Sequence, residues 1–203
     1  MTYEEIRLIF IVYTFALLPI FILIKYRKEI PSWTLNIYLI IFFVCLFGWE
    51  LWFTYGLVDG LAVDMRRSNT LNMWLPLHIN WLLNSLADAG TVSLGGLWLM
   101  WRFKKKDITI FKQWRWDAFI FLVIWCVGQN IIVELFLYQD QLSVGKAISW
   151  APLSPLGPYI NPILLEYGDR TVMLQGQVPW LLMPAFLYKL VIYLNNKDVK
   201  RRD

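Results

Sequence analysis

The sequence predicts an all-α integral membrane protein built as a five-transmembrane-helix bundle. Of its 203 residues, 58% are hydrophobic and 17% are aromatic, whereas soluble domains are about 45–50% apolar even when glycine is counted. Five apolar segments also come close to or exceed the roughly 20 residues that a helix needs to cross the hydrocarbon core of a bilayer. We therefore treat residues 1–203 as a single membrane domain.

The five predicted spans cover residues 6–24, 35–57, 77–101, 118–138 and 178–194. The first lacks a small-residue cleavage site and is expected to be a retained helix, not a signal peptide. The second is apolar except for Glu50. The third is the least apolar, because it carries asparagine, serine, threonine and aspartate side chains. The fourth contains Gln129, Asn130 and Glu134, and the fifth contains prolines at 179 and 184.

Lysine and arginine are distributed unequally between the segments that join these spans. The loops after the first and third spans and the C-terminal tail hold thirteen of them, and the opposite side holds five. Cytoplasmic loops carry the excess of positive charge, so we expect a cytoplasmic C-terminus. An odd number of spans then places the N-terminus outside or in a lumen. The charged residues that give the net charge of +4 cluster between the apolar segments, as in a membrane protein, and this argues against a nucleic-acid partner.

The longer loop, from 139 to about 177, has four prolines between Pro152 and Pro162. Proline at this density excludes a regular helix. We expect residues 150–162 either to fold over the bundle as a lid or to lie on the membrane surface. Cys45 and Cys126 both fall inside apolar runs and are expected to be buried, unpaired side chains.

Several helices bring a polar group into the membrane. Residues three, four and seven apart share a helix face, so Trp81, Asn84, Asp88 and Thr91 form one stripe of the third span. Glu50 lies within the second span. In the fourth span Asn130 and Glu134 are one turn apart, with Gln129 beside them. The polar residues that we expect to contact a bound substrate, together with Trp81 of the third-span stripe, are Asn84, Thr91, Gln129, Asn130 and Glu134.

A charge inside a bilayer costs about 2.5–3.5 kcal/mol by insertion scales. Because no lysine or arginine occurs at matching depth in the same spans, Glu50 and Asp88 are expected to share a proton or to be neutral, as a general acid must be. The alternative is that these polar groups only hold helices together through hydrogen bonds, a role that suits Asn84 well.

Tryptophans surround the two acids. Trp49, Trp52, Trp81 and Trp180 lie deep in the spans, where an indole face can stabilise a cation. The sequence contains no P-loop, no GxGxxG and no GxSxG, and its single histidine excludes an HExxH zinc motif. We therefore expect neither a cofactor nor a metal site.

With these residues identified, the chain resembles the emopamil-binding protein family, whose shared region is the EXPERA domain. The resemblance covers about residues 37–194 and rests on four short motifs in order. They are Glu50 with Trp52 and Phe53, Asp88 with Thr91, Val127-Gly128-Gln129, and Gln177 with Trp180, Leu181 and Pro184. The sequence departs from the family at Leu46, where the isomerases carry histidine, and at Asp88 and Gln177, where they carry glutamate and asparagine.

This resemblance implies five helices around an internal lipid cavity, and an enzyme that moves a double bond of a sterol-like lipid through a carbocation. Asp88 would be the proton donor, Glu50 part of the proton shuttle and Trp180 a cation-stabilising wall. Thr91 and Gln177 would line the cavity and hydrogen-bond the acids. The resemblance also implies a homodimer.

Other functions remain open. The motif around Trp49 and Glu50 is similar to that of the fungal membrane-bound meroterpenoid cyclases, which protonate an isoprenoid and cyclise it. Sterol-binding relatives of the sigma-two-receptor type would use the same cavity without turnover. A proton-coupled transporter is disfavoured, because such folds usually contain inverted repeats and this sequence shows none.

Overall fold

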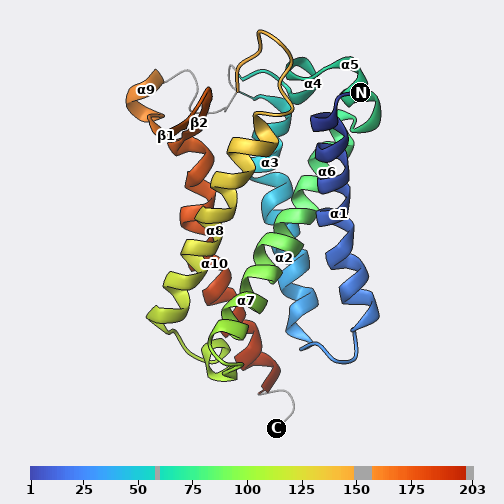
Figure 1. The fold of residues 1–203 in the computed structure, drawn as a ribbon. Helices are drawn as coiled ribbons and strands as arrows, with labels where there is room; N and C mark the ends of the chain where they lie inside the picture. The colour runs from blue at the N-terminus through green and yellow to red at the C-terminus, as the bar shows by residue number, and fades with distance from the viewer. Residues whose placement is uncertain (58–59, 149–156, 200–203) are drawn as a thin grey trace.

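The computed structural model describes residues 1–57, 60–148 and 157–199. Long helices run side by side in it, and the start of the first helix and the end of the last lie at opposite ends of the bundle (Figure 1). The predicted all-α class is confirmed for the described residues, with one two-stranded hairpin added at the end where the chain begins.

The first predicted span is α1, Tyr3–Lys25. It starts before residue 6 because Thr2 and Glu5 form a capping box, in which each side chain binds the backbone N–H of the other. Such a box satisfies amide groups that the first helical turn leaves without partners. The sequence expectation placed this start too late because it followed apolar residues only.

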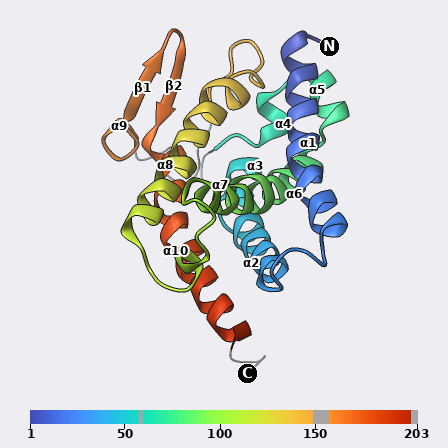
Figure 2. The same cartoon turned by 60° about the horizontal axis from the view of Figure 1, so that its bottom comes forward.

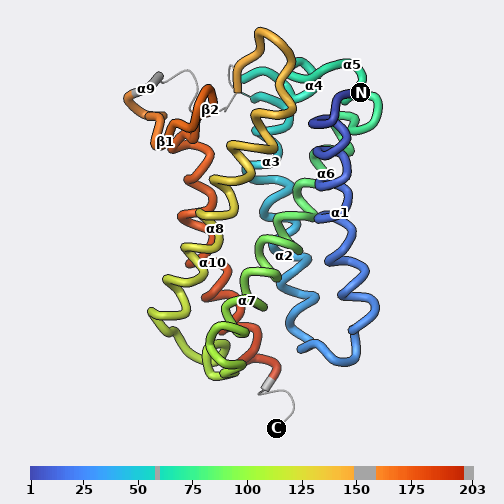
Figure 3. The backbone as a smooth tube through the Cα atoms, in the orientation of Figure 1, coloured from blue at the N-terminus to red at the C-terminus, as the bar shows by residue number. Residues whose placement is uncertain are grey.

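The second predicted span is not one helix. It consists of α2, Trp33–Phe47, and α3, Trp49–Tyr55, which meet at Gly48 with a bend of 41°. A Cβ atom at Gly48 would collide with the carbonyl oxygen of Val44, so the chain turns here as only glycine allows. We call the helices that together occupy one predicted span a column. Figure 3 shows the backbone of the column formed by α2 and α3.

The third column is helical throughout but changes its winding. It begins as α6, Leu77–Ala87, continues as the π-helical segment η1, Asp88–Leu94, and ends as α7, Gly95–Phe103. The fourth column has the same construction, with α8, Trp116–Ile132, followed by the π-helical segment η3, Val133–Tyr138. The fifth column is α10, Leu174–Val199, which contains both prolines.

Among the described residues, three helices are long and apolar enough to cross a membrane: α1, the α8–η3 run and α10. A fourth crossing results if the bent pair of α2 and α3 counts as one span. The column formed by α6, η1 and α7 carries most of the polar side chains expected inside the bundle.

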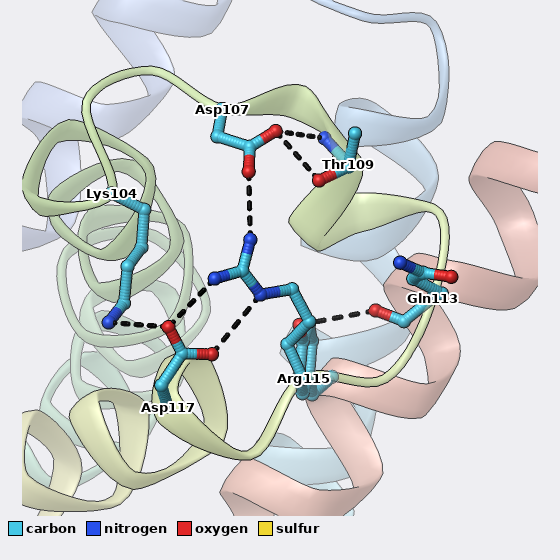
Figure 4. A network of polar contacts seen from close by, with 7 residues as sticks. Lys104, Asp107, Thr109, Gln113, Arg115 and Asp117 are labelled. Carbon is cyan, nitrogen blue, oxygen red and sulfur yellow. Dashed lines mark hydrogen bonds and ion pairs between the residues drawn. The ribbon is translucent and has the colours of Figure 1, made fainter.

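The loops at one end of the bundle carry most of the basic residues and are joined to the last helix. Ser32 donates to Asp198 (2.6 Å), and Asn195 and Asn196 donate to backbone carbonyls near η2, Ile108–Phe111. In the α7–α8 loop, Arg115 forms ion pairs with Asp107 (2.8 Å) and Asp117 (2.9 Å), as Figure 4 shows. These contacts fix the loop against the bundle.

The opposite end holds two short helices, α4, Val63–Arg66, and α5, Asn69–Trp74. It also holds a hairpin of β1, Ile163–Tyr167, and β2, Arg170–Met173, preceded by α9, Gly157–Ile160. Figure 2 shows the hairpin standing to one side of the bundle. Of the proline-rich loop 150–162, residues 150–156 lie outside the described part of the chain. The expectation that this loop contains no regular helix is wrong for α9, because proline is tolerated in the first turn of a helix, where no intrahelical N–H bond is lost.

Two separate apolar cores hold the helices together. The larger lies between α2, α7, α8 and α10 and includes Ile41, Leu122 and Leu187, all without exposed surface. The smaller joins α1 to α5 and α6 through Leu8, Leu71 and other side chains. Cys45 and Cys126 are buried and unpaired in the larger core, as expected.

Candidate functional site

A cavity of about 950 Å³ lies between α1, α3, the α6–η1 column and the α8–η3 column. Its lining is mostly aliphatic and aromatic, and its polar side chains come from several different elements. Some lining residues are exposed on the outside of the bundle, among them Phe103, Ile124 and Ile132. The cavity therefore reaches the apolar outer surface of the helices.

Glu50 reaches this cavity because of the break at Gly48. It is the second residue of α3 and is 2% exposed. Asn84 lies close enough to interact with the carboxyl group of Glu50, while the Oε2 atom of Glu50 has no hydrogen-bond partner among the described residues. Buried carboxyl oxygens almost always have a partner, so the free oxygen marks a position where a bound molecule or water fits.

Asp88 is the first residue of η1 and lines the same cavity. The indole N–H of Trp49 donates to its Oδ2 atom (2.9 Å), and Ser93 donates to its backbone carbonyl (2.8 Å). Glu50 and Asp88 are close enough to interact electrostatically. The two acids expected from separate spans thus meet at one cavity.

Arg66 also lines the cavity, and sequence reasoning missed it. It extends from α4, is 2% exposed, and donates through Nη2 to the carbonyl of Phe53 (2.5 Å). Burial lowers its pKa to about 10, so it remains a cation at neutral pH, and it interacts electrostatically with Glu50. The expectation that no base lies near the acids held for the spans but not for the loops.

Further polar lining residues complete the end of the cavity nearest α4. Thr54 is 1% exposed, and its hydroxyl has no partner among the described residues. Asn80 accepts from Arg67 at 3.4 Å. Periodicity could have identified both, since Thr54 lies one turn after Glu50 and Asn80 one turn before Asn84.

The four predicted tryptophans fall into two groups. Trp49 and Trp180 form an edge-to-face pair with ring centroids 5.4 Å apart, and Trp180 lines the cavity. Trp81 donates to the carbonyl of Leu46 (2.7 Å), and Trp52 is 41% exposed. Trp49, Trp52 and Trp81 do not belong to the described lining of the cavity, although Trp49 donates a hydrogen bond to Asp88, which does.

Four other predicted binding residues do line it: Asn84, Thr91, Gln129 and Asn130. The side chains of three of them also donate hydrogen bonds to backbone carbonyls. Thr91 donates to the carbonyl of Phe15 (2.7 Å), Gln129 to that of Cys126 (2.9 Å) and Asn130 to that of Gly176 (2.7 Å). The hydroxyl of Thr91 is therefore directed to α1 and not to an acid.

Glu134 and Gln177 form a separate cluster outside the described lining of the cavity. Glu134 has no exposed surface and accepts from the backbone N–H of Met173 and from Nε2 of Gln177, both at 2.8 Å. Gly176 packs directly against its carboxyl group. This cluster fastens the hairpin and the start of α10 to η3.

Within the described ranges, no group of three or more histidine, cysteine, aspartate or glutamate side chains could hold a metal ion. Comparisons with family models, curated proteins and solved structures gave no match.

Proposed function

We propose that this protein is a five-span intramembrane acid–base enzyme that protonates a C=C bond of an isoprenoid or sterol-like lipid. The observation that carries the proposal is the meeting of Glu50 and Asp88 at one largely apolar cavity of about 950 Å³. Its size and lining suit a lipid. The motifs resembling the emopamil-binding protein and EXPERA family support the same chemistry.

In this proposal the column from Leu77 to Phe103 is the fifth crossing, although it contains more polar side chains than the other four columns. Polar and ionisable side chains inside a membrane face the bundle interior and mark functional sites. Asn84, Asp88 and Thr91 all line the cavity, as this role requires. With five crossings, the end of the bundle that carries the basic loops is cytoplasmic.

The proposed reaction begins with proton transfer from Asp88 to one alkene carbon. A C–H bond forms from the π electrons, and the other carbon becomes a cation. Trp49 holds Oδ2 of Asp88 through its N–H, which leaves Oδ1 to carry the proton. The paired rings of Trp49 and Trp180 provide aromatic surface beside the cation.

Loss of a proton from a neighbouring carbon completes the reaction. If the proton leaves directly, the double bond has moved; if a second alkene attacks the cation first, a ring has formed. Glu50 accepts this proton and passes it to Asp88, which restores the proton donor, and the charge of Arg66 offsets the negative charge left on the carboxyl groups during the cycle. No proton is gained or lost overall.

A non-catalytic lipid-binding protein is the second candidate. The observation that favours it is the electrostatic interaction between Arg66 and Glu50. It gives Glu50 a partner within the protein, and a structural role then accounts for its burial without catalysis.

Solvent deuterium incorporation distinguishes the two. The purified protein is reconstituted in D₂O with a Δ8-sterol or a linear polyprenol, and carbon-bound deuterium is measured by mass spectrometry. An enzyme incorporates deuterium, and Glu50→Gln or Asp88→Asn reduces the rate about 10²- to 10⁴-fold while lipid binding persists. Glu166→Gln, on the exposed strand β1, is the matched control. Incorporation that is absent, or unchanged in both cavity variants, contradicts the proposal.

A further inference from the structure

The cavity has two chemically different ends. Near α4 its lining includes Thr54, Arg66 and Asn80. Toward the basic end of the bundle its lining is Leu99, Phe103 and Phe121, which are entirely apolar. Glu50 and Asp88 lie between these two ends along α3 and the α6–η1 column.

Two polar groups of α3 that line the cavity are buried without a hydrogen-bond partner among the described residues. They are the Thr54 hydroxyl and the Oε2 atom of Glu50, one turn away. An unsatisfied buried polar group costs about 1–3 kcal/mol. Two of them on one cavity wall indicate that a polar atom of a ligand belongs there.

Arg66 gives this end a fixed donor. Its Nη2 atom is held by the Phe53 carbonyl, which lies next to Thr54 in the chain, and its pKa of about 10 keeps the guanidinium charged at neutral pH. Because Arg66 and Thr54 both line this end of the cavity, an oxygen that accepts hydrogen bonds, from a hydroxyl or a carboxylate, is the head group that suits them. A lipid ammonium group does not fit beside the guanidinium.

We infer that the cavity binds a single-headed amphiphile in one orientation, with its oxygen head group at Thr54 and Arg66 and its hydrocarbon tail toward Phe103 and Phe121. This inference rests on the proposed function only in naming the bond that reacts. Orientation then sets the distance from head group to acid, because both acids have fixed positions along their helices.

Helical rise gives that distance. Thr54 follows Glu50 by four residues, which is about 6 Å along a helix, and Asn80 precedes Asp88 by eight, which is about 12 Å. The alkene that reacts therefore lies about 6–12 Å from the head-group oxygen. Lipids of the same class with the double bond outside this interval bind but do not react.

The head-group site is tested by binding, without turnover. Farnesol, farnesoic acid and the saturated hydrocarbon of the same chain are titrated against the protein in nanodiscs, with tryptophan fluorescence as the readout. We expect the alcohol or the acid to bind at least about fivefold more tightly than the hydrocarbon. Whichever of the two binds more tightly identifies a neutral or an anionic head group.

Variants identify the side chains responsible. Thr54→Val keeps the shape and removes the hydroxyl, and Arg66→Lys keeps the charge and removes the planar donor. Either is expected to reduce the preference for the head-group lipid about fivefold, whereas Thr70→Val, at an exposed position of α5 outside the cavity lining, leaves it unchanged. Because every variant is measured in the same bilayer, lipid partitioning cancels in the ratio. An unchanged preference in both cavity variants, or an equally tight hydrocarbon, overturns the inference.

Photocrosslinking tests the orientation separately. Two farnesol analogues carry a diazirine near the hydroxyl or at the far end of the chain, and the labelled peptides are identified by mass spectrometry. We expect the first to label α3 and α4 and the second to label α7 and the start of α8. The reverse pattern, or identical labelling, contradicts the orientation. Because neither test needs turnover, the head-group site and the enzymatic proposal can fail independently.

Discussion

Asp88 has its position because neighbours in two other segments fix it. The N–H of Trp49 holds its carboxyl group, and the hydroxyl of Ser93 holds its backbone carbonyl at the start of the π-helical turn. Thr91, one turn later, is bonded to α1 instead. The carboxyl group of Asp88 lines the cavity. Its Oδ2 atom accepts a hydrogen bond from Trp49, and its Oδ1 atom does not.

Gly90 lies where α1 packs closely against η1. A Cβ atom there would lie 2.5 Å from Cγ of Pro19 and 3.3 Å from the Tyr38 ring. Neither the proline ring nor the backbone behind it can yield easily. We predict that Gly90→Ala lowers stability by about 1–3 kcal/mol, or roughly 2–12 °C in thermal unfolding of the detergent-solubilised protein.

Gly95→Ala is the matched control for this prediction. It lies in the same column, yet the nearest atom to its added Cβ would be the Gly90 carbonyl oxygen at 3.9 Å. This variant should retain or slightly raise the unfolding temperature, since alanine favours helix over glycine by about 0.5–1 kcal/mol. Equal melting of the two variants would show that α1 does not pack on Gly90 as described.

At this scale, helical periodicity predicted the site only in part. Asn84, Asp88 and Thr91 share a face by spacing alone, and all three line the cavity. Arg66 could not be predicted in this way. It lies in α4, after a seven-residue connection that follows α3, and the sequence of such a segment does not show whether its side chains turn back into a bundle.

At the scale of elements, the most consequential feature is the interruption of helices. The break at Gly48 directs α3 so that Glu50 reaches the cavity, and π-helical segments begin at Asp88 and at Val133, beside Glu134. Apolar run lengths predicted these columns well. They could not show the interruptions, because a run of apolar residues is equally long whether its helix is straight, bent or rewound.

The hairpin was missed for a different reason. Its strands join at Gly168 and Asp169, with Gly168 at a φ of 63°, and a two-residue Gly-Asp turn between apolar runs is a recognised hairpin signal. The prolines upstream predict an irregular loop instead of strands. Glu134, expected among the binding residues, instead holds this hairpin through Met173 and Gln177.

We predict that Glu134→Gln lowers the free energy of unfolding by about 1–3 kcal/mol. Glutamine replaces one carboxyl oxygen with a donor, so either the Met173 N–H or the Gln177 amide faces another donor. Chemical or thermal denaturation in detergent measures the effect. Glu166→Gln, on the exposed face of β1, should change little.

A reciprocal exchange separates loss of this bond from general disturbance. The double variant Glu134→Gln with Gln177→Glu again pairs an amide donor with a carboxylate and leaves an oxygen for Met173. Stability should recover relative to Glu134→Gln alone. Failure to recover would mean that the acid does more at position 134 than accept these two hydrogen bonds.

At the scale of the whole molecule, charge and fold agree on two unlike ends. Lys25, Lys104 and Arg115 lie at the end where α10 finishes, and the contacts of Asn195 and Asn196 fasten that end together. At the other end, Asp140 pairs with Arg7 of α1 and with Arg170 of the hairpin. Of the other basic groups at this end, Arg66 and Arg67 are buried.

This asymmetry predicts the result of cysteine labelling in intact cells. Cys45 and Cys126 are buried, so the native chain gives little background. Single cysteines replace Thr2 and the exposed Val144 at one end, and Lys28 and Thr109 at the other. With five crossings and positive charge inside, a membrane-impermeant maleimide labels the first two only, and the second two after the membrane is permeabilised. Thr2→Cys decides the number of crossings. If the column from Leu77 to Phe103 spans the membrane, Thr2→Cys and Val144→Cys are both labelled before permeabilisation. If instead Val144→Cys and Lys28→Cys are both labelled before permeabilisation, this column does not cross the membrane.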